Sequence, residues 1–241
     1  MTQNTNSRVS RRGFMKGAAT VGGGIAITSF AASFGMGTAQ AAEAGDDVAT
    51  MANLAATAET LAATSYYNTI LNNPLGYSDD DLVYLKLALS SEMYHLAILQ
   101  SLGGKSLTDK FYVPATFLSD SGTNAKTFMA AETAFTGAYL AATRRFAELG
   151  LPNLAATTAQ HAATEAEHLA LTRMIGGFIP NPNALPAPIY YNVSNAVPTL
   201  APFLKGGTGF IGPVPFPGAD AINALLGGIK AFPVLPYVKA Y

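Results

Sequence analysis

Most glutamate and histidine residues of this chain fall into one repeated arrangement. Of its seven glutamates and three histidines, six residues follow the order Glu, Glu-x-x-His, Glu, Glu-x-x-His. They are Glu59, Glu92, His95, Glu132, Glu165 and His168. A Glu and a His three positions apart lie on one side of a helix. Carboxylates together with imidazoles bind iron, manganese or zinc, so the pattern predicts a metal site.

The surroundings of the glutamates indicate that they are buried. Glu59 shares a helical face with Ala55, Ala62 and Tyr66, and Glu92 interrupts a stripe of leucines. An unpaired buried carboxylate costs several kcal/mol or becomes protonated. Two divalent cations would balance the four negative charges. A single Glu-x-x-His is more often a surface pair, but two of them alternating with two glutamates on apolar faces favour the metal site.

Four helices are expected to position these residues. The apolar runs extend from about residue 49 to 71, 79 to 102, 124 to 149 and 153 to 175, and Gly, Pro or Asn follows each one. Asp79–Asp81 suit the first turn of the second helix, and Asn153 is predicted to cap the fourth. Short links make two antiparallel hairpins. About twenty residues between the second and third helices predict a crossover connection.

These residues and this connectivity resemble the ferritin-like di-metal carboxylate proteins. The resemblance covers residues 49–177 and implies an all-α, ferritin-like four-helix bundle with a long crossover between its second and third helices. It makes Glu92 and Glu165 bridging ligands, with Glu59 and His95 on one metal and Glu132 and His168 on the other. The implied cofactors are two divalent iron or manganese ions, with zinc as an inert substitute. The implied function is an oxidoreductase acting on O2 or peroxide, of ferroxidase, peroxidase or catalase type.

Other polar residues close to this pattern allow more than one interpretation. His161, one turn before Glu165, could be an extra ligand, a hydrogen-bond partner of a ligand, a proton relay or a core histidine. Tyr66 and Tyr139 could be redox-active, although packing is the favoured interpretation. Glu148 and Glu167 are expected to be solvated.

The N-terminus resembles a twin-arginine export signal. Arg11 and Arg12 with Phe14 and Lys16 precede an apolar, Gly/Ala-rich stretch from Gly17 to Met36. Cleavage is expected after Ala41, so that residues 1–41 form the signal peptide and the protein becomes periplasmic or extracellular. The alternative is a retained amphipathic anchor. No stable transmembrane span is expected in the mature form.

Composition excludes several partners and cofactors. The formal net charge is −1, and four of the basic residues lie in the leader, so the mature chain is mildly acidic and nucleic acid is not an expected partner. The chain has no cysteine, which excludes disulfides and thiolate ligands.

The last part of the chain, residues 178–241, is a Pro/Gly-rich apolar tail. Eleven of the fourteen prolines lie here, and one helix at about residues 219–231 is the expected regular element. The tail is expected to pack on the bundle, close the site or make a homo-oligomer contact, with Tyr190 and Tyr191 as an anchor. With the leader, it resembles exported ferritin-like and desiccation-related proteins, and no storage cage is expected. The alternative functions are a non-catalytic stress or surface protein with structural metals, or a metal scavenger.

Overall fold

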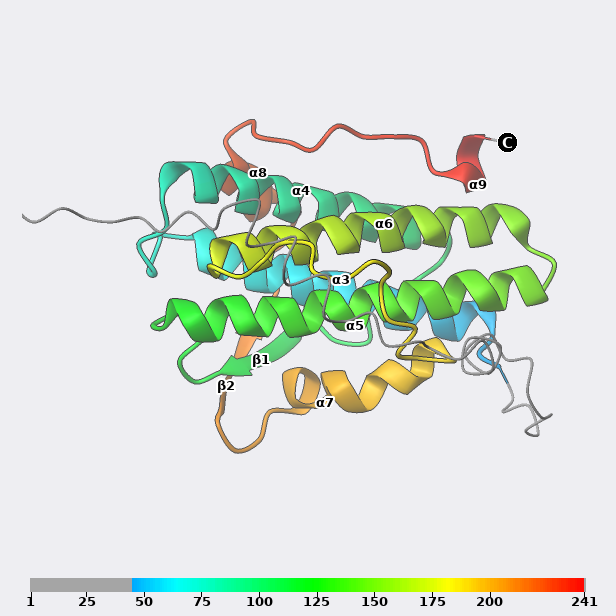
Figure 1. The fold of residues 1–241 in the computed structure, drawn as a ribbon, viewed down its shortest axis with the longest axis horizontal. Helices are drawn as coiled ribbons and strands as arrows, with labels where there is room; N and C mark the ends of the chain where they lie inside the picture. The colour runs from blue at the N-terminus through cyan, green and yellow to red at the C-terminus, as the bar shows by residue number, and fades with distance from the viewer. Residues whose placement is uncertain (1–44, 241) are drawn as a thin grey trace, which may run out of the picture. The chain divides into compact units, whose positions relative to one another are not determined.

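The computed structural model describes residues 45–240, which are mostly helical (Figure 1). Four long helices come first: α3 (Val48–Ile70), α4 (Asp79–Ser101), α5 (Ser121–Glu148) and α6 (Pro152–Ile175). Their bounds differ from the predicted ones by three residues or fewer. The expected signal peptide, residues 1–41, lies outside the described residues.

Side chains at the helix starts explain these boundaries. Asp47 accepts a 2.7 Å hydrogen bond from the backbone N of Thr50 at the start of α3. Ser78 and Asp81 form a reciprocal capping box on α4. The predicted capping role of Asn153 is wrong, because α6 begins one residue earlier, at Pro152. Proline suits a first helical position because its φ is already helical and its missing N–H needs no partner there.

The four long helices lie side by side and pack as two hairpins, α3 with α4 and α5 with α6 (Figure 1). Packing of α3 on α5 and of α4 on α6 joins the hairpins. Helix α4 is long and apolar enough to cross a membrane by length and composition alone. In the structure its apolar residues Leu85, Leu89 and Leu96 are buried against other parts of the chain.

A two-stranded sheet interrupts the helical architecture, and the sequence analysis did not predict it. Strand β1 (Lys110–Pro114) lies in the connection between α4 and α5 and pairs antiparallel with β2 (Phe210–Pro215). Phe111, opposite Val214 in this register, is fully buried. The partner strand is about one hundred residues away, so short-range patterning gave no sign of the pairing.

The tail is more structured than predicted. Besides β2 it contains a 3-10 helix η1 (Val193–Ala196), α7 (Val197–Lys205), α8 (Ala219–Leu226) and α9 (Tyr237–Ala240). The predicted helix at 219–231 is present as α8, but it ends at Leu226, and the expectation that it is the only regular element of the tail is wrong. Pro198 did not prevent α7, because it occupies the first turn. Helix α8 ends early because Gly227 takes a left-handed conformation with φ 60°.

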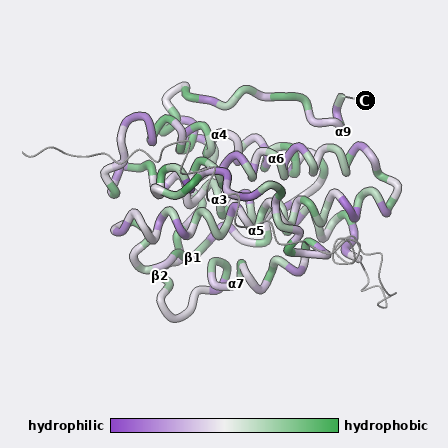
Figure 2. The backbone as a smooth tube through the Cα atoms, in the orientation of Figure 1, coloured by the Kyte–Doolittle hydropathy of each residue, from purple (hydrophilic) through white to green (hydrophobic). Residues whose placement is uncertain are grey.

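The tail packs on the long helices, and Figure 2 shows apolar residues along both. Ile222 and Leu226 of α8 are buried in the main core. Gly137 of α5 admits the close approach of Ile189, since a Cβ there would lie 2.5 Å from Ile189 Cγ1. The guanidinium of Arg144 lies 3.6 Å from the ring centroid of Tyr191.

Candidate metal centre

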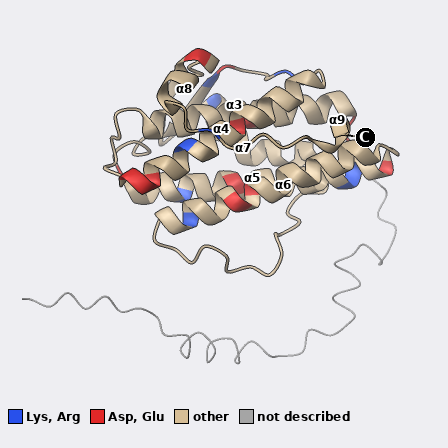
Figure 3. Cartoon of the chain, turned by 90° about the horizontal axis from the view of Figure 1, so that it is seen from above, with Lys and Arg blue, Asp and Glu red and all other residues tan. Residues whose placement is uncertain are grey.

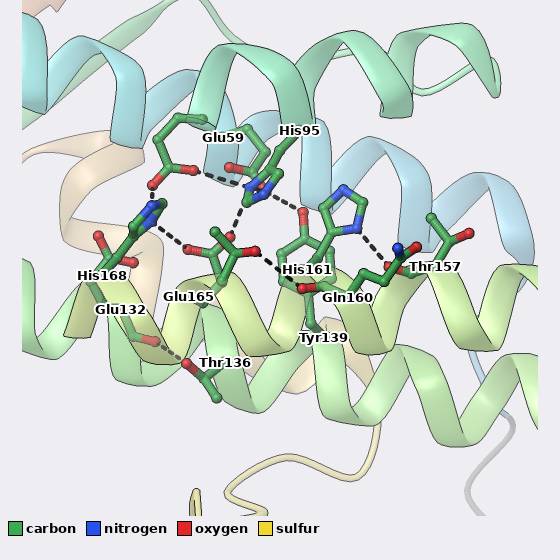
Figure 4. Close-up of polar contacts among 12 residues, drawn as sticks. Glu59, His95, Glu132, Thr136, Tyr139, Thr157, Gln160, His161, Glu165 and His168 are labelled. Carbon is green, nitrogen blue, oxygen red and sulfur yellow. Dashed lines mark hydrogen bonds and ion pairs between the residues drawn. The ribbon is translucent and has the colours of Figure 1, made fainter. Parts of the chain in front are cut away.

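The structure brings all six predicted residues together in the interior between the four long helices. Figure 4 shows Glu59, His95, Glu132, Glu165 and His168 there. Each helix contributes one glutamate, and α4 and α6 each add a histidine one turn further on. The four glutamates are at most 1% exposed, and His95 and His168 are 5% and 6% exposed. This burial agrees with the prediction that the glutamates lie on apolar helix faces.

The six residues form two overlapping groups. One contains Glu59, Glu92, His95 and Glu165, and the other contains Glu92, Glu132, Glu165 and His168. Within each group, one potential ligand atom from every residue lies within 4.8 Å of the others. Glu92 and Glu165 belong to both groups.

The histidine contacts follow the same division. Nδ1 of His95 lies 3.0 Å from Glu165 Oε1, 3.3 Å from Glu92 Oε2 and 3.6 Å from Glu59 Oε1. Nδ1 of His168 lies 2.9 Å from Glu92 Oε1 and 3.3 Å from Glu165 Oε2. Both imidazoles therefore direct a nitrogen at the two shared carboxylates.

Unsatisfied oxygens test whether this donor set fits a cation. All four glutamates have a buried oxygen without a hydrogen bond in the described chain, and in Glu92 both oxygens are in this state. Some of these oxygens are within ion-pair distance of a histidine nitrogen, but the geometry is not that of a hydrogen bond. Four carboxylates also outnumber two imidazoles, so histidine protonation alone cannot neutralise the cluster. These buried Glu and His residues could hold a metal ion.

The electrostatics of the cluster show the same deficit of positive charge. Burial raises the pKa of Glu59 and Glu132 well above the usual value, and the neighbouring Glu165 and Glu92 raise it further. Burial disfavours the charged form of Glu92 too, but the charged imidazole of His168, together with close polar contacts from His168, His95 and Glu59, outweighs burial and lowers that pKa. Without a cation, the two unshared glutamates are thus the ones that retain protons.

Two tyrosines hold the unshared glutamates. Tyr66 of α3 donates a 2.6 Å hydrogen bond to Glu132 Oε1 on α5, and Tyr139 of α5 donates to Glu59 Oε1 on α3. Burial, followed by the nearby carboxylates, raises the pKa of both hydroxyls, which keeps them protonated as donors. The favoured sequence interpretation of packing alone is therefore incomplete.

A constant offset in the sequence would have revealed these tyrosines. Four residues of the site in the second hairpin each lie 73 positions after a residue of the same type in the first hairpin. The pairs are Glu59 and Glu132, Tyr66 and Tyr139, Glu92 and Glu165, and His95 and His168. The tyrosines thus belong to the same duplicated pattern as the glutamates and histidines.

His161 lies beside the cluster. Its Nδ1 is 2.8 Å from the backbone oxygen of Thr157, and its ring centroid is 4.5 Å from that of His95 and 4.8 Å from that of Tyr139. Burial and the positive charge of His95 lower the pKa of His161 to about 4. The neutral ring donates from Nδ1, so Nε2 carries a lone pair, and it has no hydrogen-bond partner within the described residues.

The remaining predicted residues lie on the surface. Glu167 is exposed, as expected. Glu148 is also exposed and forms ion pairs with Arg144 and Arg145. Lys and Arg are sparse and scattered over residues 45–240 rather than gathered into a stripe (Figure 3).

Comparisons with known protein families, with curated proteins and with solved structures give no match to this chain.

Proposed function

We propose that this protein is an exported member of the ferritin-like di-metal carboxylate class, an oxidoreductase acting on O2 or peroxide. The observation that carries the proposal is the pair of overlapping Glu/His groups that share Glu92 and Glu165. One Glu from each of two helices and Glu-x-x-His from each of the other two is the ligand set of ferritin-like di-iron and di-manganese proteins. The four side-by-side helices support the ferritin-like bundle.

In this proposal Glu92 and Glu165 would be ligands shared by two metal ions. Glu59 and His95 would complete one site, and Glu132 and His168 would complete the other. Two iron or manganese ions would supply the electrons exchanged with O2 or peroxide. The protein orients Glu132 and Glu59 through Tyr66 and Tyr139, and the apolar walls of the helices limit access of water.

Metal analysis and peroxide consumption test the proposal. The full chain is reconstituted with Fe(II) or Mn(II), and we expect about two ions per chain together with peroxide loss above that of free metal. Glu92→Gln and Glu165→Gln should each reduce binding at both sites, since the lost charge belongs to both groups. Fewer than one metal per chain after reconstitution would refute the proposal.

The same variants separate an enzyme from a protein with structural metals. If the protein is an enzyme, Glu92→Gln should lose turnover although circular dichroism shows that the variant is folded. Two bound metals that raise the melting temperature, with no turnover of O2 or peroxide in the parent, would instead assign a structural or stress-related role. Binding without turnover or stabilisation would indicate a scavenger.

Export through the twin-arginine route is a separate part of the proposal. Replacing Arg11 and Arg12 by Lys should retain the precursor in the cytoplasm, because the paired arginines define that signal. Fractionation of cells and the mass of the exported protein measure the result. Export of the double-lysine variant at the parent's level would exclude this route.

A further inference from the structure

A cavity of about 620 Å³ opens beside the candidate metal centre. It lies between α4, α6, α8 and the residues that follow α8, and its lining includes His95 and His161. This volume falls within the range of pockets that hold small organic molecules, about 300–1,000 Å³. O2 and peroxide need only a small part of it.

The C-terminal segment forms the outer wall of this cavity. Between α8 and α9 it runs along α4 and α6 (Figure 1). Its attachment to α4 uses a hydrogen bond from Ala231 N to Ser90 Oγ and one from Tyr94 Oη to Val234 O. On the α6 side, Val238 N donates to Thr157 Oγ1. The wall is thus fixed to both helices.

The lining combines apolar surface with uncharged polar groups. Met93, Ile98 and Leu226 provide apolar surface, and Ser91 and Thr164 provide hydroxyls. Apart from the histidines, Lys230 is the ionisable basic residue of this lining. The chemistry suits a mostly apolar molecule and disfavours a highly charged one such as a polyphosphate.

His161, which lines both this cavity and a smaller one, carries a buried polar atom without a partner in the described part of the chain. The residue is 3% exposed. Its Nδ1 donates a hydrogen bond to the backbone oxygen of Thr157, and its Nε2 has no hydrogen-bond partner within the described residues. In Figure 4 the bonded nitrogen faces Thr157 and the other nitrogen faces away from it. A buried acceptor without a donor is costly in the free protein, and a ligand O–H or N–H would satisfy it.

The duplicated hairpins differ at this place. The counterpart of His161, 73 positions earlier, is Ala88, and the counterpart of Phe128 is Ala55. Phe128 stacks on Tyr66 at 4.3 Å between centroids, whereas Ala55 lines a second, apolar cavity of about 140 Å³ that also touches Tyr139 and His161. Both cavities therefore adjoin the group that contains Glu59 and His95, the larger through His95 and the smaller through Tyr139.

We propose that the larger cavity binds an organic substrate of the metal centre, a mostly apolar molecule with one O–H or N–H group that donates to Nε2 of His161. Its role as a substrate site rests on the proposed function. The binding itself depends on the cavity and on His161, so it can be measured with or without metal.

Two matched probes test this site on the full chain. 1-Naphthol has an apolar body and one hydroxyl donor, and 1-methoxynaphthalene has a similar body without the donor. Titration calorimetry should show 1-naphthol binding about 3- to 10-fold more tightly, the value of one neutral hydrogen bond. His161→Leu should abolish this difference and leave binding of the methoxy compound in place.

A second pair of variants locates the probes. Ala163 is an exposed lining residue, so Ala163→Trp should fill part of the cavity and weaken both probes by about tenfold or more. Ala130→Trp is the control, since Ala130 is exposed on α5 and outside this lining. Equal affinities of the two probes in the parent, no saturable binding, or unchanged binding in Ala163→Trp would each overturn the proposal.

The outcomes separate this site from the proposed function. Two bound metals and peroxide consumption without naphthol binding would remove the cavity proposal alone. Naphthol binding that responds to Ala163→Trp, without metal binding or turnover, would leave a ligand site and remove its role as a substrate site. Circular dichroism establishes that each variant is folded, and the comparison of probes on the parent needs no variant.

Discussion

The hydroxyl of Tyr66 on α3 donates a 2.6 Å hydrogen bond to Glu132 Oε1 on α5, and Tyr139 on α5 makes the reciprocal contact with Glu59 on α3. Each hairpin thus supplies the donor that orients the unshared glutamate of the other. Because both hydroxyls are buried and protonated, these contacts leave the second oxygen of each glutamate available to a cation.

Removal of one tyrosine hydroxyl should weaken metal binding. In Tyr66→Phe, Glu132 loses its donor, so we expect metal affinity to fall about 10-fold or more and unfolding of the metal-free chain to become easier by about 1–3 kcal/mol. Competition titration and urea unfolding measure these effects. The control is Tyr77→Phe, which removes a 3.0 Å hydrogen bond to Asn124 outside the site. If both variants bind metal as the parent does, Tyr66 does not support the site.

The unshared and shared glutamates should differ in metal stoichiometry. Glu59 belongs to one group, so Glu59→Gln should lose about one ion per chain. Glu92→Gln, which alters both groups, should lose more. Elemental analysis at equal free metal measures the ratio, with the exposed Glu148→Gln as control. Equal losses from Glu59→Gln and Glu92→Gln would contradict the two-group arrangement.

Stabilisation by metal should increase with pH. In the metal-free chain the pKa values of Glu59, Glu132, His95 and His168 are raised. A group whose pKa is raised by folding stabilises the folded state at pH values below its pKa in the unfolded chain. This stabilisation is lost as the pH rises through its pKa in the folded chain. Metal ions bind the deprotonated forms and release these protons. The difference in melting temperature between loaded and metal-free protein should therefore grow from about pH 5 to about pH 8 at fixed free metal. A constant difference would count against these ligands.

Loss of one attachment should loosen the C-terminal segment without unfolding the helices. Tyr94→Phe removes the 2.8 Å hydrogen bond to Val234 O, so amide exchange at Ala231 and Val238 should accelerate about 5-fold. Hydrogen-exchange mass spectrometry of residues 229–240 measures this change. Tyr84→Phe on the exposed face of α4 provides the control. Unchanged exchange in Tyr94→Phe would show that this bond does not hold the segment.

The small sheet should be part of the cooperative core. Phe111 is fully buried in the same core cluster as Ile222 and Leu226, so Phe111→Ala should reduce the free energy of unfolding by about 3–5 kcal/mol. The nearby Leu107 is 64% exposed, and Leu107→Ala should have little effect. Urea unfolding measures the free energy of unfolding of both variants. If Phe111→Ala lowers it by no more than Leu107→Ala does, the sheet lies outside the cooperative core.

The sequence determined the four long helices and the six clustered residues, because both depend on local patterns. Apolar periodicity and stop residues defined the helices. Four glutamates on apolar faces required a common interior, and the structure brings them together. The start of α6 was predicted one residue too late, because Pro152 occupies the first helical position and Leu151, rather than Asn153, is the N-cap.

Tertiary structure decided the features that join distant segments. β1 and β2 are strands only because each supplies the other's hydrogen bonds, and α8 is placed by burial of Ile222 in a core built from other helices. The tyrosine contacts and the cavity beside His161 likewise depend on how the two hairpins and the tail face one another. Local patterning specifies which face of a helix is buried, whereas the partner of that face is fixed only when the chain packs.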